Sequence, residues 1–289
     1  MVYAIIKELR IHQWLKNTFV LIPLIFDRQL LRVDSFIQSL LGFFLFCFVS
    51  SAVYIINDIM DLEADRKHPK KRNRPIAAGR ISIKFAWVIA IVLTGGSVAA
   101  AFFLSPWFML ILIIYFLLNL AYSYKLKHYP IIDVMIIATG FVLRVAGGVS
   151  LLVVERFSPW LYVVTTLFAL FLGLGKRRGE LVTVQNSDHA QRKVLDGYTI
   201  PFLDQLITIV SATTIVSYSL YTFSAPNLPE NHAMMLTIPF ALYGIFRYIY
   251  LIQVKNEGGA PDELVLVDRP LQVTFVLFGF SILFIFYLF

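Results

Sequence analysis

The side chains best suited to chemistry are four oxygen-bearing groups that follow an apolar stretch, in the sequence NDIMDLEAD at 57–65. Asn57, Asp61 and Asp65 recur every four positions, so a helix would put them on one face with Asp58 beside them. Like charges at this spacing destabilise a helix, and proteins usually bind Mg²⁺ with one or two carboxylates plus substrate phosphates. The pattern predicts a site for Mg²⁺ and a diphosphate. All four groups are candidate metal ligands, and the three aspartates are candidate catalytic residues.

The basic loop that follows, residues 66–75, allows a plainer interpretation, in which its cations simply neutralise an acidic helix end. Because the four groups share one face directly after an apolar run, we favour the metal site. Within the loop, Arg72 and Arg74 are candidates to bind phosphate oxygens. The alternative for both is a solvated cation that fixes membrane topology.

A second cluster, GLGKRRGE at 173–180, has three consecutive cations followed by one carboxylate. Arginine binds phosphate with a planar fork and lysine binds it as a point charge, so Lys176, Arg177 and Arg178 are candidate phosphate ligands. Glu180 is a candidate to orient them or the substrate. The alternative is a cationic anchor at a membrane boundary, which would explain the three cations equally well.

Four weaker candidates for substrate contacts are Lys16, Tyr122, Lys125 and Arg144. Tyr122 and Lys125 could also be an aromatic belt with a snorkelling lysine. A charge within an apolar span is a functional candidate, but Arg144 could equally form a structural ion pair. Asp133 is then a possible partner, because the separation of 11 residues is about three helical turns.

The elements that must position these groups are membrane helices. The chain is 58% hydrophobic with a mean hydropathy of +0.75, and its apolar segments approach the ~20 residues that cross a bilayer as helix. The segments are 15–33, 36–56, 85–104, 107–124, 131–154, 159–175, 202–224, 235–252 and 271–289. Charges and Pro23 interrupt the first, so we expect eight or nine spans and favour nine. The prediction is an all-α integral membrane protein forming one domain over 1–289.

The distribution of charge predicts the orientation. With nine spans, twenty of the 25 Lys and Arg residues fall on one side of the membrane, together with the N-terminus. The positive-inside rule makes that side cytosolic, in a cell's cytoplasmic membrane. The net charge of +7 does not indicate nucleic-acid binding, because the cations come in short loops between spans.

NDIMDLEAD resembles the first motif, NDxxDxxxD, of UbiA-type intramembrane prenyltransferases. In that superfamily about nine helices surround a central cavity open to lipid, and the motif binds a substrate diphosphate through Mg²⁺. Two further family motifs differ here. GLGKRRGEL stands in place of a second acidic DxxxD motif, and Tyr122 lies three residues from Lys125 where a YxxxK spacing is usual.

The whole chain resembles one branch of that superfamily, the decaprenyl-phosphate phosphoribosyltransferases. The matching stretches are IHQWLKN (11–17), YIINDIMDLEADRKHPKKRNRPIAAG (54–79), AYSYKLKHYPIIDV (121–134), GFVLRVAGG (140–148), LGKRRGEL (174–181) and FRYIYL (246–251). The resemblance implies Mg²⁺ as cofactor, phosphoribosyl diphosphate as donor, polyprenyl (decaprenyl) phosphate as acceptor, and a role in cell-envelope biosynthesis. Extra cations suit a site that must hold a diphosphate, a 5-phosphate and a lipid phosphate.

Two alternatives remain open at this point. One is a prenyltransferase of the same superfamily that moves a prenyl group from a prenyl diphosphate to a small acceptor. The other, from a different class, is a carrier for a lipid phosphate or an anion, although repeated halves are not evident in the sequence. The sequence leaves open the length of the lipid chain and the oligomeric state.

Overall fold

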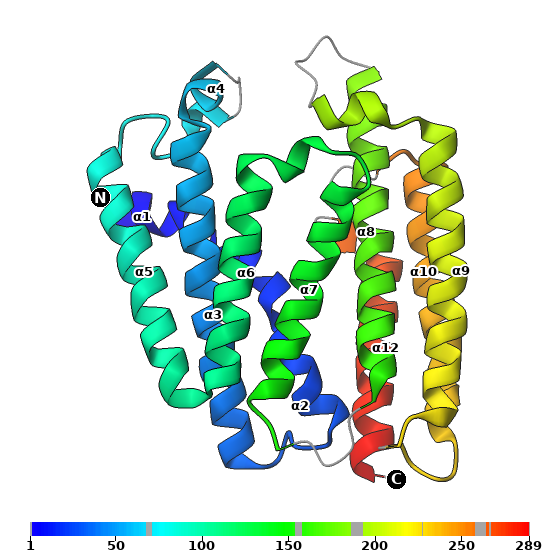
Figure 1. Ribbon diagram of the computed structural model, residues 1–289. Coiled ribbons are helices and arrows are strands. Elements are labelled where there is room, and N and C mark those ends of the chain that lie inside the picture. Colours follow the sequence, from blue (N-terminus) through cyan, green and yellow to red (C-terminus); the bar gives the residue numbers. More distant parts are fainter. Residues whose placement is uncertain are drawn as a thin grey trace. The chain divides into compact units, whose positions relative to one another are not determined.

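The computed structural model describes residues 2–67, 71–153, 158–185, 193–226, 228–257, 264–265 and 267–288. Among these, eight helical stretches are long and apolar enough to cross a membrane (Figure 1). They are α3 (Val33–Met60), α5 (Ile83–Leu104), α6 (Pro106–Tyr124), α7 (Ile132–Ser150), α8 (Pro159–Gln185), α9 (Ile200–Ser224), α10 (Ile238–Gln253) together with the preceding 3-10 helix η5 (Ala233–Thr237), and α12 (Arg269–Leu288). The predicted class, an all-α multi-pass membrane protein, is confirmed.

Local sequence explains where several of these helices begin. The hydroxyls of Ser82 and Thr199 accept hydrogen bonds from backbone N–H groups three residues on, which caps α5 and α9. Proline occupies the first position of α6 and of α8, where its missing N–H costs nothing. Pro106 also ends α5, because the residue before a proline is driven out of the helical region.

The chain divides into two compact units, residues 1–124 with 143–154 and residues 125–142 with 155–289. Helix α7 contributes its first turns to the second unit and its last turns to the first. In the first unit α3 packs along α5 and α6, and the buried Phe46 meets Phe108 and Tyr115 edge to face. In the second unit α8 packs along α9, around a core that includes Phe171 and Leu203.

The first apolar segment, 15–33, forms no single long helix, and this accounts for eight long helices where about nine were expected. The structure has α1 (Val2–Glu8), the 3-10 helix η1 (Ile11–Leu21) and α2 (Ile22–Phe26) instead. Arg10 separates the first two with a left-handed backbone (φ 51°), and Pro23 lies at the start of α2. An 11-residue 3-10 helix is unusually long, which indicates tertiary contacts that hold it.

Those contacts run antiparallel along α3, so the broken segment follows α3 from one end to the other (Figure 1). The pairs, in chain order, are Arg10 with Asp58, Trp14 with Ser51, Asn17 with Cys47 and Ser50, and Gln29 with Ser35. Gly148, near the end of α7, permits a further close approach, since a Cβ there would lie 2.1 Å from the carbonyl oxygen of Val20. The segment therefore makes a pass along α3 that is held by polar contacts.

Candidate active site

The four acidic-motif residues gather where α3 ends and the short helix α4 (Leu62–Lys67) begins. Asn57 Nδ2 donates to Asp61 Oδ2 at 3.2 Å, and both side chains are half-buried. Asp58 and Asp65 are more deeply enclosed, each only 2% exposed. One guanidinium nitrogen of Arg74 contacts both of them, Asp58 at 3.0 Å and Asp65 at 2.6 Å. The structure thus pairs Asn57 with Asp61, and joins Asp58 to Asp65 through Arg74.

The charge of this cluster is balanced by cations from two flanking segments. Arg10 donates from one nitrogen to both carboxylate oxygens of Asp58, at 2.6 and 2.7 Å, and its guanidinium stacks over the ring of Tyr54. From the loop after α4, Arg74 bridges the two aspartates, and the Lys71 ammonium lies 3.8 Å from Asp65. The plainer interpretation of the sequence, an acidic end neutralised by the following loop, thus describes part of what is present.

The oxygen donors nevertheless suit a hard divalent cation. The half-buried amide–carboxylate pair of Asn57 and Asp61 offers oxygen ligands of the kind that Mg²⁺ prefers. Within the described ranges, no group of three or more His, Cys, Asp or Glu side chains is arranged to hold a metal alone. A site of this kind depends on substrate phosphates for its remaining ligands, which is the usual arrangement for Mg²⁺.

Glu8, the last residue of α1, was not anticipated as a member of this cluster. Its side chain is only 3% exposed, and neither carboxylate oxygen has a hydrogen-bond partner among the residues that the structure describes. Burial, and after it the negative charge of Asp58, raises the pKa of Glu8 to about 7. The one signal in the sequence was a carboxylate at the end of a mostly apolar helix, VYAIIKE, where it follows Lys7.

The cluster on α8 has a different character, because its arginines are buried. Arg177 is 1% exposed, and it donates to Asp133 Oδ2 at 2.5 Å and to Glu180 Oε2 at 2.6 Å. Arg178 is 6% exposed and donates to Asp204 Oδ1 at 2.6 Å and to the backbone carbonyl of Ile252. These contacts fasten α8 to α7, α9 and α10 within the second unit.

A strained turn completes the surroundings of Arg177. Tyr198 Oη donates to Asp133 Oδ1 at 2.7 Å and accepts from the backbone N–H of Ile131 at 2.5 Å. Ile131 has a left-handed backbone (φ 69°), which is costly for a β-branched residue. Asp133, which the spacing favoured as the partner of Arg144, is therefore held by Arg177 and Tyr198.

Arg144 lies in the last turns of α7, in the first unit, where it is 6% exposed. It donates to Asn17 Oδ1 at 2.7 Å and to Tyr115 Oη at 2.8 Å. The amide of Asn17 in turn donates to Cys47 Sγ and Ser50 Oγ on α3. This polar chain ties the 3-10 helix η1 into the first unit.

The remaining predicted residues are more accessible. Lys16 is half-buried on η1 and donates to Gln13 at 2.6 Å. Tyr122, in the last turns of α6, and Lys176, on α8, are also half-buried, while Arg72 and Lys125 are exposed. Whether any of them touches a substrate stays a prediction.

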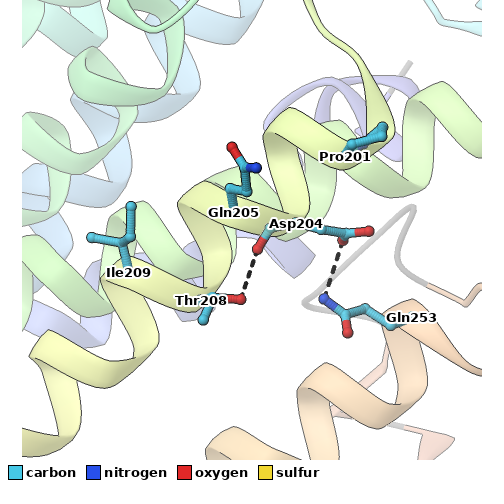
Figure 2. Close-up of a pocket in the computed structure, with 6 residues that line it drawn as sticks. All are labelled: Pro201, Asp204, Gln205, Thr208, Ile209 and Gln253. Atoms are coloured by element: carbon cyan, nitrogen blue, oxygen red, sulfur yellow. Dashed lines mark hydrogen bonds between the residues drawn. The ribbon is translucent and has the colours of Figure 1, made fainter.

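An open pocket of about 470 Å³ lies on the surface of α9 and α10 (Figure 2). Its lining residues are Pro201, Asp204, Gln205, Thr208, Ile209 and Gln253. Asp204 accepts from Gln253 Nε2 at 3.1 Å and from Arg178. None of the predicted site residues lines this pocket, and it meets the α8 cluster only through Asp204.

The fold and the acidic end of α3 define a multi-pass membrane transferase. The model of the UbiA prenyltransferase family matches residues 28–267, which is most of the chain. The chain therefore belongs to the UbiA prenyltransferase family.

Individual relatives agree with this membership. A decaprenyl-phosphate phosphoribosyltransferase of Corynebacterium glutamicum is 34% identical, over 96% of this chain and 85% of its own length. One of Mycobacterium tuberculosis is 33% identical, over 94% and 91%. A solved structure of a UbiA homologue from Archaeoglobus fulgidus, bound to GPP and Mg²⁺, has a TM-score of 0.73 at 19% identity, over 97% of this chain and 99% of that one. That likeness supports the fold, and the relatives confirm the resemblance seen in the sequence.

Proposed function

We propose that this protein transfers the 5-phosphoribosyl group of phosphoribosyl diphosphate to a polyprenyl phosphate such as decaprenyl phosphate, releasing diphosphate, with residues 1–289 acting as one transferase domain. The observation that carries the proposal is the acidic end of α3. There, oxygen donors suited to a divalent cation lie within reach of two arginines suited to phosphate. The proposal is supported by relatives that bear this activity's name and align over nearly the whole chain.

In this proposal Asn57 and Asp61 supply oxygen ligands for Mg²⁺, and Asp58 and Asp65 support them. When bound, Mg²⁺ would neutralise the departing diphosphate. Arg74 carries its guanidinium on a loop and is 26% exposed, so it can turn from the aspartates to phosphate oxygens at little cost in buried surface. Arg72, exposed on the same loop, is a second phosphate contact.

The reaction exchanges one bond at ribose C1. An oxygen of the lipid phosphate forms the new bond while the bond from C1 to the diphosphate oxygen breaks, and the bonding pair leaves with the diphosphate. The acceptor is already an anion, so it needs positioning more than deprotonation, and we assign no general base. Carboxylates near C1 would favour the positive charge that develops there.

The other cations have two proposed roles: some contact substrate phosphates, and others hold helices in position. Lys176 is half-buried and is our candidate for a direct phosphate contact, with Lys16, Tyr122 and Lys125 as further candidates. The guanidinium groups of Arg177 and Arg178 are buried and already engaged by carboxylates, Arg177 by Asp133 and Glu180 and Arg178 by Asp204, so we assign both arginines the task of holding α8 in position. Arg144 similarly supports η1, which carries Lys16.

We further propose that the N-terminus and the acidic end of α3 face the cytosol, in the cytoplasmic membrane. The ion pair of Arg10 with Asp58 supports this orientation, because it keeps the N-terminal segment at the same end of α3 as the basic loop 66–84. Both segments are rich in lysine and arginine, as cytosolic segments are. Phosphoribosyl diphosphate, a soluble metabolite, would enter from that side.

The direct test is a transfer assay with purified protein in detergent, polyprenyl phosphate, radiolabelled phosphoribosyl diphosphate and Mg²⁺. We expect label in the organic phase, abolished by EDTA and by Asp61→Asn. The matched control is Glu63→Gln, which removes an exposed carboxylate two residues away and should leave transfer unchanged.

Two results would favour the alternatives. Consumption of a prenyl diphosphate with an aromatic acceptor, and no transfer of label from phosphoribosyl diphosphate, would make the protein a conventional prenyltransferase. Movement of a lipid phosphate between leaflets without chemistry and without dependence on Mg²⁺ would make it a carrier.

A further inference from the structure

The proposed function leaves one buried group unused. Glu8 lies at the end of α1 with 3% of its side chain exposed, and neither of its carboxylate oxygens has a hydrogen-bond donor among the residues that the structure describes. Buried polar groups are normally hydrogen-bonded, and leaving one without a partner is destabilising. A carboxyl group in this condition therefore calls for an explanation in ligand binding or in strain.

The surroundings of Glu8 point to the acidic site. Asp58 lies close enough to interact with the Glu8 carboxyl by charge and by hydrogen bonding, and Arg10 close enough to interact by charge. Arg10 follows Glu8 by two residues and grips Asp58 through both carboxylate oxygens. The backbone of Arg10 is left-handed, a conformation that is strained for a non-glycine residue and that turns the chain here. Glu8 and Arg10 thus approach Asp58 from one short junction.

We propose, resting on the function above, that Glu8 is an oxygen ligand of the acidic site and joins Asp58 in holding a divalent cation once Arg10 turns to the phosphates of the donor. Without that cation, Arg10 and Arg74 both donate to Asp58, whereas neither carboxylate oxygen of Glu8 has a hydrogen-bond partner among the described residues. A hard cation coordinated by both groups removes this deficit, because it accepts several oxygen ligands at once. The junction from α1 to η1 then contributes both a metal ligand and a phosphate contact.

Arg10 is suited to such an exchange of partners. Its side chain is 20% exposed in its pair with Asp58, whereas the aspartate is 2% exposed. Its guanidinium also rests on the Tyr54 ring, 4.8 Å from the centroid, and that contact can be kept while the fork rotates toward an anion. The exchange needs rotation of one side chain and leaves α3 in place.

A metal-binding measurement tests whether Glu8 is a ligand without relying on enzymatic turnover. The probe is radiolabelled Mn²⁺ with inorganic diphosphate, followed by equilibrium dialysis against the purified protein in detergent. We expect Glu8→Gln, which keeps the shape of the side chain, to weaken retention of Mn²⁺ by at least about tenfold, the size of effect that loss of a supporting metal-site group has. Glu8→Asp should retain part of the affinity. Glu63→Gln, the exposed control, should bind as the wild type does.

A Glu8→Gln protein that retains Mn²⁺ as the wild type does, while Asp58→Asn loses it, would overturn the proposal and leave Glu8 as a buried acid beside Asp58. An apparent melting temperature measured on each variant separates loss of the site from loss of the fold. The experiments distinguish a failure of the proposed reaction from a failure of the proposed role of Glu8. Mn²⁺ binding that needs Glu8, without transfer of a phosphoribosyl group, contradicts only the proposed reaction. Transfer with Mn²⁺ affinity independent of Glu8 contradicts only this inference.

Discussion

The acidic end of α3 and the basic run on α8 contain the same kinds of charge in opposite arrangements. At the end of α3 the carboxylates belong to the rigid helix, and their arginines come from short flanking segments and are 20% and 26% exposed. On α8 the arginines belong to the helix, and the carboxylate of Asp133 that receives one of them is completely buried. The half-buried arginines at the end of α3 are candidates for exchange with a ligand, while the buried pair of Arg177 with Asp133 is fixed.

This difference reverses what residue types alone would favour. From the sequence, the three consecutive cations on α8 are the stronger candidate for a phosphate site, and the acidic motif is a candidate for a metal site. In the structure the consecutive arginines fasten helices together, and the less conspicuous Arg10 and Arg74 are half-buried cations paired with the acidic end of α3. The ion pairs therefore fall into a fixed set on α8 and an exchangeable set at the end of α3, and mutation should affect the two sets differently.

The largest effect should come from the fixed set. Arg177→Met leaves the carboxylate of Asp133 buried without its cation, and breaking such a pair costs ~3–5 kcal/mol. We expect the apparent melting temperature in detergent to fall by roughly 10 °C. Adding Asp133→Leu should restore a large part of the loss, because the second change removes the stranded charge. A stable Arg177→Met protein with impaired phosphate binding would instead make Arg177 a ligand.

Mutation at the acidic end of α3 should lower transferase activity and leave the stability of the protein nearly unchanged. Asp61→Asn removes the charge of a half-buried carboxylate that accepts from the amide of Asn57 and keeps the size of the side chain, so the fold should survive with a melting temperature near that of the wild type. Transfer of phosphoribosyl should fall by about 100-fold or more, the effect expected when charge stabilisation at a leaving group is lost. A comparable fall with Glu63→Gln would show that the loss is not specific to the motif face.

A smaller effect is expected at the turn before α7. Tyr198→Phe removes the hydroxyl that donates to Asp133 and accepts from the N–H of Ile131, which leaves both groups short of a partner. The expected cost is ~1–3 kcal/mol, measured as a lower midpoint of denaturation. Tyr122→Phe, a hydroxyl removal outside this turn, is the comparison. Equal stability of the two variants would argue that the hydroxyl of Tyr198 adds nothing to the fixed set.

The smallest effect is a pH dependence at Glu8. Its pKa is raised from an ordinary 4.5 to about 7, so the folded protein keeps a proton that the unfolded chain has already released. Stability of the metal-free wild type should therefore fall as the pH rises from about 4.5 toward 7, and then level off. Glu8→Gln lacks this titration. Its melting temperature should match the wild type near pH 4.5 and exceed it by a few degrees at pH 8.

Together with the Mn²⁺ measurement, this gives Glu8 a distinctive signature. A ligand residue that is strained without its metal should, when replaced, yield a protein that is more stable and binds metal less well. If Glu8 had a purely structural role, its replacement would lower both the stability and the metal affinity of the protein, or would change neither. Melting temperatures at pH 4.5 and pH 8, without and with Mn²⁺, provide the comparison on one pair of proteins.

The eight long helices were predictable because their signals are local. Apolar runs of nearly bilayer length give the approximate ends of the eight long helices found among the described residues, although the sequence favoured nine. The hydrogen bond between Asn57 and Asp61 was predictable for the same reason, since helical spacing puts side chains four residues apart next to each other.

The partners of the charged groups were not predictable in this way. Asp58 meets Arg10 across 48 residues, and Arg177 meets Asp133 across 44, so no spacing rule connects them. Glu8 and Arg10 resembled ordinary charges near an N-terminus, and their burial against α3 depends on the tertiary path of η1. The break in the first apolar segment was signalled by Pro23, but the length of the 3-10 helix was not.

That broken segment also bears on how the chain is assembled into a membrane. A stretch that contains Lys16, Pro23 and Asp27 is a poor substrate for independent insertion by a translocon, which partitions segments by their hydrophobicity. Its polar groups find their partners on α3, at Ser51 and Ser50 among others. The stretch is therefore expected to wait in the translocon until α3 has been synthesised and to enter the bilayer with it as a hairpin. Biogenesis of this protein would then begin with its second apolar segment.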